Sequence, residues 1–353
     1  MRVVQVIDRL NVGGAERVLV DLANLLYENN CDVTVVCLLE EGQLDGYINK
    51  AIPLIYLRRK NKYNPLYLIR LYRILIQFDV IHIHLRQVLR YVSLLFYSLN
   101  LHKKKVVVFH DHFGKIDIDK EISLSIKEAL KRCKAYIGVS EQLTCWAKAN
   151  SVNTKIIKLT NIVRAERRIQ STHLSFNQVN IVSVGNFRPQ KNYEFLCQLI
   201  ADSPNNYYYT IYGQVVDMVY YNKILVLLRQ LRVRNRVTII TDCKSVLPEL
   251  SKYHLGLHCA TSETGPLVAL EYLSMQLPFV AYHTGEVAKN VAQYFPQLIQ
   301  RDFDVENWKS SIHNVLTQRE DYTKKLHRYF FENYSDTVYV EKCLKIYNTL
   351  LTN

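Results

Sequence analysis

Short apolar runs alternate with amphipathic helical patterns along most of the chain, and this alternation restricts the fold more than any other feature. The first apolar run, Val3 to Ile7, precedes a helical pattern from Ala15 to Glu28. Further strand-like runs lie at Val33 to Leu38, Val80 to Ile83, Val106 to Phe109 and Tyr136 to Val139. Strands separated by helices pair in parallel through right-handed crossovers, so the alternation predicts a doubly wound α/β layer.

The alternation is interrupted once and then starts again. Ala165 to Gln178 is polar and charged without an apolar period, which indicates a linker. Strand-like runs resume after it, at Ile181 to Val184, Tyr208 to Tyr212, Val237 to Ile240, Leu255 to His258 and Phe279 to Ala281. We therefore predict an α/β protein with two doubly wound, Rossmann-like domains, residues 1–168 and 175–334, that face a cleft. Ligands of such sheets bind at the carboxyl ends of the strands.

Composition is consistent with two ordinary cores, since 49% of the 353 residues are hydrophobic. The eight cysteines form no C-x-x-C motif, and we expect reduced, buried thiols in a cytosolic protein rather than disulfides or a zinc site. Neither a secretory signal nor an apolar run long enough to span a membrane is recognisable. We expect a protein that is soluble or bound to a membrane surface.

The most informative motif surrounds Gly265 and Pro266 in the second half. This pair suits the start of a helix, because glycine permits the turn and proline fits the first helical position. The N–H groups of Leu267 and Val268 would then be free to bind an anion such as a diphosphate.

Two glutamates flank this predicted helix start. Glu271 follows Leu267 by four residues and shares its helix face, where a carboxylate can accept hydrogen bonds from both hydroxyls of a ribose. Glu263 precedes the helix and would face a sugar. Solvated charges at a helix end are the alternative interpretation of this pair.

A second motif follows the strand-like run that ends at Val184. Gly185 permits a turn, and Arg188 and Lys191 then appear three residues apart before a helix. These two cations can neutralise a pyrophosphate leaving group. An ordinary basic loop is the alternative for this segment.

Two further motifs lie at strand ends of the first half. Gly13 and Gly14 would let backbone N–H groups approach a ligand closely, although a tight turn without a ligand is an alternative and the spacing is not that of a dinucleotide site. His110 follows the strand of Val106 to Phe109 and can hydrogen-bond a sugar hydroxyl or stabilise charge.

Metal binding is an alternative for the histidines. His110 and His112 are candidate ligands, with His82 and His84 nearby in the sequence. Alternate strand residues point to opposite faces, and we expect no metal site. We interpret Asp117 and Asp119, a formal D-x-D, as surface charge.

Together these segments resemble glycosyltransferase family 4, the retaining enzymes with the GT-B fold. Glu263 and Glu271 match the two glutamates of the family's E-x7-E signature, and Lys191 matches its phosphate-contacting lysine. Matches of the same kind are the first loop at Gly13-Gly14-Ala15-Glu16, the H-D pair His110-Asp111, and the later landmarks Val139-Ser140-Glu141 and Thr160-Asn161. Two positions depart from the pattern: Asn186 replaces the usual arginine, and Thr264-Gly265 replaces the usual Gly-Phe.

The resemblance implies a retaining, metal-independent hexosyltransferase without a cofactor. It implies that Glu271 holds the ribose, that Arg188 and Lys191 hold the diphosphate, and that Glu263 and His110 bracket the donor sugar. The donor would be a UDP- or GDP-sugar, with UDP favoured. The acceptor would be a glycan or a lipid-linked saccharide of surface polysaccharide biosynthesis, entering along the first domain. Residues 335–353 resemble the family's terminal helix, which crosses back to the N-terminal domain.

Positive charge is concentrated in one stretch of the first half. The formal net charge of the chain is +13. Eleven lysines and arginines lie between Arg58 and Lys105, with Asp79 as the one acidic residue among them. A helical pattern that begins at Asn64-Pro65 is apolar except for Arg70 and Arg73, which we interpret as a buried helix beside a solvated basic loop. The charge excess suggests docking on an anionic membrane surface, the inner face of the plasma membrane.

Two other functions compete with transfer. A nucleotide-sugar epimerase would keep the fold but would need further acids in the cleft and no acceptor surface. A noncatalytic nucleic-acid-binding protein would use the net charge, but no helix-turn-helix, zinc or RNA-binding signature supports it, and we expect no nucleic-acid partner.

Overall fold

The computed structural model describes residues 1–62, 64–114, 116, 121–150, 154–164, 177–243, 245–263 and 267–352. The chain divides into two compact units. Met1–Ile162 and Asp336–Asn353 form unit one, and Val163–Ser335 forms unit two. The predicted linker lies largely at residues 165–176, outside the described residues.

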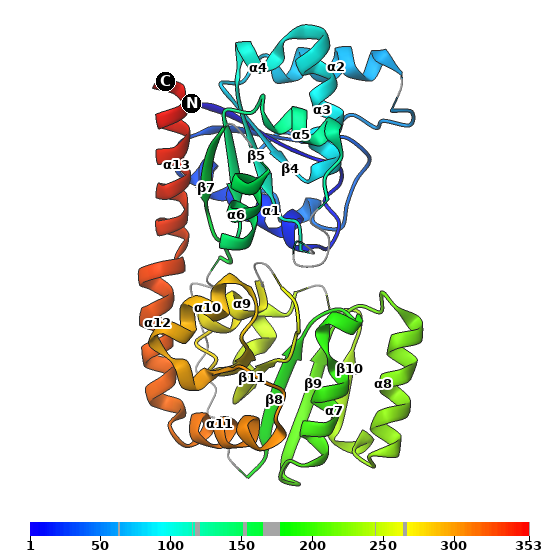
Figure 1. Ribbon diagram of the computed structural model, residues 1–353, viewed down its shortest axis with the longest axis vertical. Coiled ribbons are helices and arrows are strands. Elements are labelled where there is room, and N and C mark those ends of the chain that lie inside the picture. The colour runs from blue at the N-terminus through cyan, green and yellow to red at the C-terminus, as the bar shows by residue number, and fades with distance from the viewer. Residues whose placement is uncertain are drawn as a thin grey trace. The chain divides into compact units, whose positions relative to one another are not determined.

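Unit one is built on a parallel sheet of seven strands in the order β3-β2-β1-β4-β5-β6-β7 (Figure 1). Its central strands are buried almost throughout, which explains why apolar residues occupy both of their faces, beside the buried polar residues Gln5, His82, His84, His110 and Asp111. The strands are β1 Arg2–Ile7, β2 Asp32–Cys37, β3 Leu54–Tyr56, β4 Val80–His84, β5 Val106–Asp111, β6 Ala135–Gly138 and β7 Lys155–Lys158.

The helices of unit one start where local sequence favours a cap. In α2, Pro65 takes the first helical position and the Asn64 side chain accepts a hydrogen bond from the Leu66 N–H at 3.0 Å. The terminal helix α13 packs against α1. The helices are α1 Gly14–Glu28, η1 Asp45–Tyr47, α2 Pro65–Leu75, α3 Arg86–Leu99, α4 Leu101–Lys104, α5 Leu124–Leu130, α6 Glu141–Ala149 and α13 Asp336–Thr352, with η marking a 3-10 helix.

Unit two contains a parallel sheet of six strands in the order β10-β9-β8-β11-β12-β13 (Figure 1). The strands are β8 Val179–Val184, β9 Tyr207–Tyr212, β10 Val237–Ile240, β11 Leu255–His258, β12 Phe279–Tyr282 and β13 Ile299–Gln300. Two parallel-sheet layers connected by helices confirm the predicted α/β class.

Helices of unit two cover its sheet and enclose a separate core. Trp308 of α11 is fully buried in this core and donates its indole N–H to the Asp302 carbonyl at 2.9 Å. The helices are η2 Pro189–Lys191, α7 Tyr193–Ala201, α8 Met218–Gln230, η3 Arg234–Arg236, η4 Leu247–Lys252, α9 Leu267–Ser274, α10 Gly285–Tyr294, η5 Pro296–Leu298, α11 Val305–Thr317 and α12 Arg319–Tyr334.

Two sequence-based expectations need correction. All eight cysteines are free, but Cys145 is exposed and Cys243 is half-buried, so not every thiol is buried. Helix α2 is only partly covered, because Leu66 is 69% and Ile69 is 44% exposed. Among the described residues, no helix has both the length and the apolar character that crossing a bilayer requires.

Candidate active site

The two sheets share an arrangement that positions the predicted site residues. In unit one the chain runs from β1 outward through β2 and β3, and β4 then returns to the other side of β1. Unit two repeats this order, with β11 on the opposite side of β8 from β9. The carboxyl ends of strands at such a reversal are where doubly wound sheets bind ligands.

In unit two, the loops after β8 and β11 bring two predicted residues into contact. Lys191 Nζ donates a hydrogen bond to Glu263 Oε1, although the two residues lie 72 positions apart. Both side chains remain partly accessible, at 19% for Lys191 and 22% for Glu263. Opposite charges therefore meet at the edge of the sheet where a ligand can still reach them.

Small residues make this approach possible. A Cβ at Gly185 would lie 2.9 Å from the Lys191 side chain, and a Cβ at Gly213 would collide with the Gly185 carbonyl at 1.9 Å. The Thr261 N–H donates to the Gln190 carbonyl at 2.9 Å, which joins the loop of Lys191 to the loop of Glu263. Gly185 thus acts by leaving room for the lysine.

Burial and nearby charges set the pKa values of Glu263 and His258. Burial, the largest single influence, raises the pKa of Glu263, but the charges of Lys191, His258 and Arg188 and the hydrogen bond from Lys191 together outweigh it, so the pKa of this carboxyl is lowered. Burial lowers the pKa of His258, at the end of β11, to about 4, and the charge of Lys191 acts in the same direction. Glu263 is therefore an anion and His258 is neutral near neutral pH.

Arg188 and Asn186 complete this loop. Arg188 is exposed, and its charge helps to lower the pKa of Glu263, so it lies on the same side of the sheet. Asn186 Oδ1 accepts a hydrogen bond from the Gln214 N–H at 3.1 Å. The residue that replaces the family's usual arginine thus connects two loops and leaves Arg188 as the accessible cation of this segment.

Helix α9 carries the predicted ribose-binding glutamate. Leu267 and Glu271 are its half-buried positions, whereas the other residues of the helix, Val268 included, are buried. Tyr272 fixes the helix to the sheet, since its hydroxyl donates to the Leu257 carbonyl at 3.2 Å. Glu271 accordingly lies on the open face of α9. Gly265 and Pro266 lie outside the described residues.

In unit one, the predicted His110 belongs to a cluster with His82, His84 and His112. His84 and His110 are direct neighbours across β4 and β5, and the His84 and His112 rings stack with centroids 5.3 Å apart. The expectation that these side chains point apart was wrong. Residues two apart on a strand share a face of the sheet, so both pairs project to the same side.

Burial keeps this histidine cluster uncharged. It lowers the pKa of His82 to about 3 and that of His112 to about 4, and it holds the pKa values of His84 and His110 well below the ordinary range. A neutral imidazole has one N–H donor and one lone pair. The cluster is therefore a set of neutral donors and acceptors rather than a positively charged patch.

Two residues that the sequence did not indicate support the cluster. Gln5 Oε1 lies 2.7 Å from His84 Nε2, and the Tyr347 hydroxyl lies 2.5 Å from His82 Nδ1. Gln5 belongs to β1 and Tyr347 to α13, at opposite ends of the chain. The position of α13 in unit one, and no local sequence pattern, gives Tyr347 this contact.

Asp111, adjacent to His110, has a structural role. Arg86 donates to Asp111 Oδ2 at 2.7 Å from Nη2 and 3.1 Å from Nε, and the Tyr136 hydroxyl donates to the same oxygen at 2.9 Å. Leu85, between His84 and Arg86, has a φ of 71°, a conformation that bulky residues rarely adopt. Fixed contacts on both sides stabilise this strained residue.

Gly13 and Gly14 lie where α1 begins. Gly13 precedes the helix, and a Cβ on it would come within 2.3 Å of the Glu16 carboxylate. Burial raises the pKa of Glu16, and the nearby charge of Asp8 adds to the effect. The glycine therefore makes room for a carboxylate of its own helix, and its predicted contact with a donor stays a prediction.

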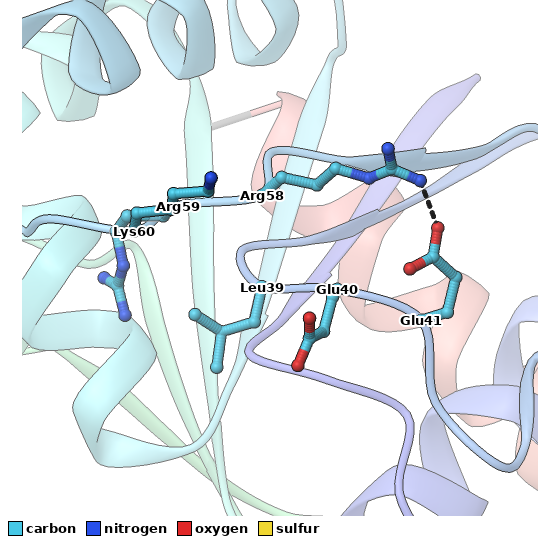
Figure 2. Close-up of a pocket in the computed structure, with 6 residues that line it drawn as sticks. All are labelled: Leu39, Glu40, Glu41, Arg58, Arg59 and Lys60. Carbon is cyan, nitrogen blue, oxygen red and sulfur yellow. Dashed lines mark hydrogen bonds and ion pairs between the residues drawn. The ribbon is translucent and has the colours of Figure 1, made fainter.

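Unit one also contains a hollow of about 440 Å³, which the sequence did not predict (Figure 2). Segments that follow β2 and β3 line it: Leu39, Glu40, Glu41, Arg58, Arg59 and Lys60. Figure 2 shows the Arg58 guanidinium directed at Glu41, with which it forms an ion pair. Arg59 lies 3.6 Å from Asp8 and stacks over the Tyr91 ring. The hollow thus offers hydrogen-bonding groups of both charges.

Comparison with known proteins agrees with this arrangement. Residues 12–167 match the model of Glycosyltransferase Family 4, and residues 166–333 match that of Glycosyl transferases group 1. No curated protein sequence matches the chain. Together the two models span most of the chain in the expected order.

Solved glycosyltransferase structures share the fold at low sequence identity. HepE of Anabaena, in complex with UDP and glucose, superposes with a TM-score of 0.80 at 14% identity, covering 99% of this chain and 100% of HepE. A glycosyltransferase of Rickettsia africae gives 0.76 at 16% identity and coverage of 100% and 99%. WaaG, a glycosyltransferase involved in lipopolysaccharide biosynthesis, gives 0.70 at 16% identity and coverage of 98% and 99%. Two matched family models and this shared architecture lead to one assignment: the chain belongs to the GT-B glycosyltransferases of the family 4 type.

Proposed function

We propose that this glycosyltransferase moves a hexose from a nucleoside-diphosphate sugar to a glycan or a lipid-linked saccharide during surface polysaccharide synthesis, with retention of anomeric configuration. The observation that carries the donor assignment is the Lys191–Glu263 pair beside β8 and β11, with Glu271 on the open face of α9. The Lys191 cation suits a diphosphate, the adjacent Glu263 carboxylate suits a sugar, and the Glu271 carboxylate on α9 suits a ribose.

The ion pair suggests how the site responds to its donor. Without a ligand, Lys191 and Glu263 neutralise each other. A diphosphate would compete for Lys191 and Arg188, and the freed Glu263 carboxylate would accept hydrogen bonds from the donor sugar. As the bond to the sugar breaks, negative charge grows on the leaving diphosphate, and the two cations stabilise it where it develops.

Other predicted residues take supporting roles in this proposal. The N–H groups of Leu267 and Val268 would face the diphosphate at the start of α9, as would the predicted turn of Gly265 and Pro266. Gly185, Gly13 and Gly14 would admit the donor by their lack of a side chain. His110 would donate a hydrogen bond to a hydroxyl of the donor sugar. No metal ion takes part in this transfer scheme.

A uridine nucleotide is the proposed donor base. HepE, which has the same fold, is described with UDP, with UDP-glucose, and with UDP and glucose. That likeness supports a UDP-sugar over a GDP-sugar here.

The proposed acceptor surface is in unit one. The hollow beside Arg58 and Glu41 offers both donors and acceptors to the hydroxyls of a saccharide. Exposed apolar residues on α2 and α3 lie among exposed cations, namely Leu66, Ile69, Leu94 and Tyr97 with Arg70, Arg73 and Arg90. We propose that this surface docks on the anionic inner face of the plasma membrane, where each cation contributes about 1 kcal/mol.

Donor binding tests the main proposal. A panel of UDP- and GDP-sugars should identify one donor that is bound and slowly hydrolysed, and Glu271→Ala should abolish binding because the ribose contact is lost. Glu249→Ala, which removes an exposed ion pair with Lys252, is the matched control and should bind normally. Wild-type binding by Glu271→Ala would contradict the site assignment.

Vesicle binding tests the membrane proposal separately. Arg70→Glu with Arg73→Glu should abolish salt-sensitive binding to vesicles that contain phosphatidylglycerol. The same reversals at Arg229 and Arg232, both exposed in unit two, provide the control. Equal binding by both double variants, or none by the wild type, would refute docking through α2.

A further inference from the structure

We propose that the histidine cluster of unit one binds one divalent transition-metal cation of the zinc class, held by His82, His84 and His110. Each of the three offers one imidazole nitrogen, and these nitrogens all lie within 4.8 Å of one another. The residues come from two adjacent strands, two from β4 and one from β5. This site would hold unit one together, and it shares His110 with the proposed transfer scheme.

The geometry of the sheet explains why three histidines converge. His82 and His84 are two residues apart on β4 and project to the same face, and His110 is the direct partner of His84 on β5. Three nitrogens around a tetrahedral zinc lie roughly 3.3 Å apart, so closing from 4.8 Å requires movements of at most about 1.5 Å. Rotation of the imidazole rings supplies movements of that size.

Unsatisfied polar atoms are the second, independent observation. Both ring nitrogens of His110 and Nε2 of His82 are fully buried without a hydrogen-bond partner. Buried polar atoms almost always have a partner, whether from the protein, water or an ion. A cation would satisfy Nε2 of His82 together with one ring nitrogen of His110.

Hydrogen bonds with Gln5 and Tyr347 orient two of the proposed ligands. The Gln5 carboxamide oxygen lies 2.7 Å from His84 Nε2, which places the proton on that nitrogen and leaves the lone pair on Nδ1. The Tyr347 hydroxyl lies 2.5 Å from His82 Nδ1, which leaves Nε2 available for a ligand. Metal-bound histidines characteristically use their second nitrogen in this way.

His112 is a candidate for the fourth position. Its Nε2 lies 3.1 Å from Nδ1 of His84, close to the separation of two nitrogens on one zinc ion. One nitrogen of His110 on the cation would leave its other nitrogen, as N–H, for a sugar hydroxyl, so this inference does not depend on the proposed function.

Cobalt binding tests the site directly. Full-length protein without a polyhistidine tag would be stripped with a chelator and titrated with Co²⁺, and the d–d absorption bands would report coordination. We expect one equivalent to bind, displacement by Zn²⁺, and a higher unfolding temperature with either ion. Absence of d–d bands together with an unchanged unfolding temperature would overturn the proposal.

Variants separate a metal site from mere packing. His110→Asn removes a ligand that makes no hydrogen bond, so the fold should survive while Co²⁺ binding is lost. Tyr347→Phe should weaken binding by about 10- to 100-fold, because it removes the hydroxyl that orients the His82 ring. His258→Asn alters a buried histidine of unit two and should bind Co²⁺ normally. Binding by His110→Asn at wild-type affinity would refute the site.

Discussion

Strand β4 of unit one and strand β11 of unit two occupy the same place in their sheets, and each ends in a buried histidine. His84 contacts Gln5 and another histidine, both uncharged. His258 instead faces the charges of Lys191 and Glu263, which act on its pKa in opposite directions. The same topological position thus supports a neutral, buried histidine cluster in one unit and a charged, accessible pair in the other.

The strand end in unit one therefore has a structural role, and the strand end in unit two is suited to binding a ligand. Complete burial in unit one favours fixed hydrogen bonds, and charge there survives only where it is paired, as in Arg86–Asp111. Partial exposure in unit two allows an ion pair to be exchanged for a ligand at small cost, because water screens the groups while they separate. We expect variants in unit one to change stability and variants in unit two to change activity.

Asp111→Asn should produce the largest effect and should act on stability. The change leaves Arg86, only 12% exposed, without a carboxylate partner, and breaking a buried pair costs about 3–5 kcal/mol. Urea unfolding in a Trp308→Phe background would report on unit one through Trp146, because the chain has two tryptophans. Glu128→Gln, which breaks exposed pairs with Lys131 and Arg132, should leave the urea midpoint nearly unchanged. Equal losses for the two variants would contradict the comparison.

Lys191→Ala should have the next largest effect and should act on catalysis. Removing a cation that stabilises the leaving diphosphate should lower kcat by about 10²- to 10³-fold. Steady-state transfer or donor hydrolysis measures the loss, and urea unfolding should change little because the lysine is partly exposed. Lys223→Ala, which opens an exposed pair with Glu194, is the control with normal kcat expected. A stability loss without a loss of kcat would reverse the assignment of roles.

The stability of unit two should depend on pH because His258 is buried in its neutral form. Its pKa is about 4 in the folded chain and 6.5 as the ordinary value, so the unfolded state binds the proton more readily. Stability should therefore be complete above about pH 6.5 and fall by about 1.4 kcal/mol per pH unit toward pH 4. Glu263, whose pKa is lowered, adds its own loss only at lower pH, below its ordinary 4.5.

His258→Asn isolates this contribution. The variant should lose the part of the slope between pH 6.5 and pH 4 that comes from His258, while half-exposed groups such as His283 still titrate. Unfolding followed through Trp308 in a Trp146→Phe background measures unit two alone. Identical slopes for the variant and its parent would show that His258 is not held neutral.

The sequence predicted the fold and the donor-site residues of unit two. Each apolar run named from the sequence forms a strand, because strands buried on both faces require continuous apolar residues. The resemblance to glycosyltransferase family 4 predicted that Glu263 and Lys191 share one donor site. Their direct contact depends on Gly185 and Gly213, whose close approach no local pattern encodes.

The histidine cluster was harder to predict from sequence. Spacing alone places His82 with His84 and His110 with His112, but bringing the pairs together requires knowing that β4 and β5 are neighbours. Tyr347 and Gln5 are 342 positions apart, and the position of α13 in unit one is a result of tertiary packing. Contacts of that range follow from the whole fold and not from periodicity.

Thr284→Val should produce the smallest effect and tests how the charged pair is positioned. The Glu263 N–H donates to Thr284 Oγ1 at 3.0 Å, so valine removes this acceptor while keeping the shape of the side chain. A lost hydrogen bond of about 1 kcal/mol should reduce kcat roughly fivefold if the loop shifts Glu263. Thr284→Ser keeps the hydroxyl and should retain wild-type kcat. If valine also retains wild-type kcat, the ion pair with Lys191 alone positions Glu263, and the site in unit two is held by charge rather than by its loop.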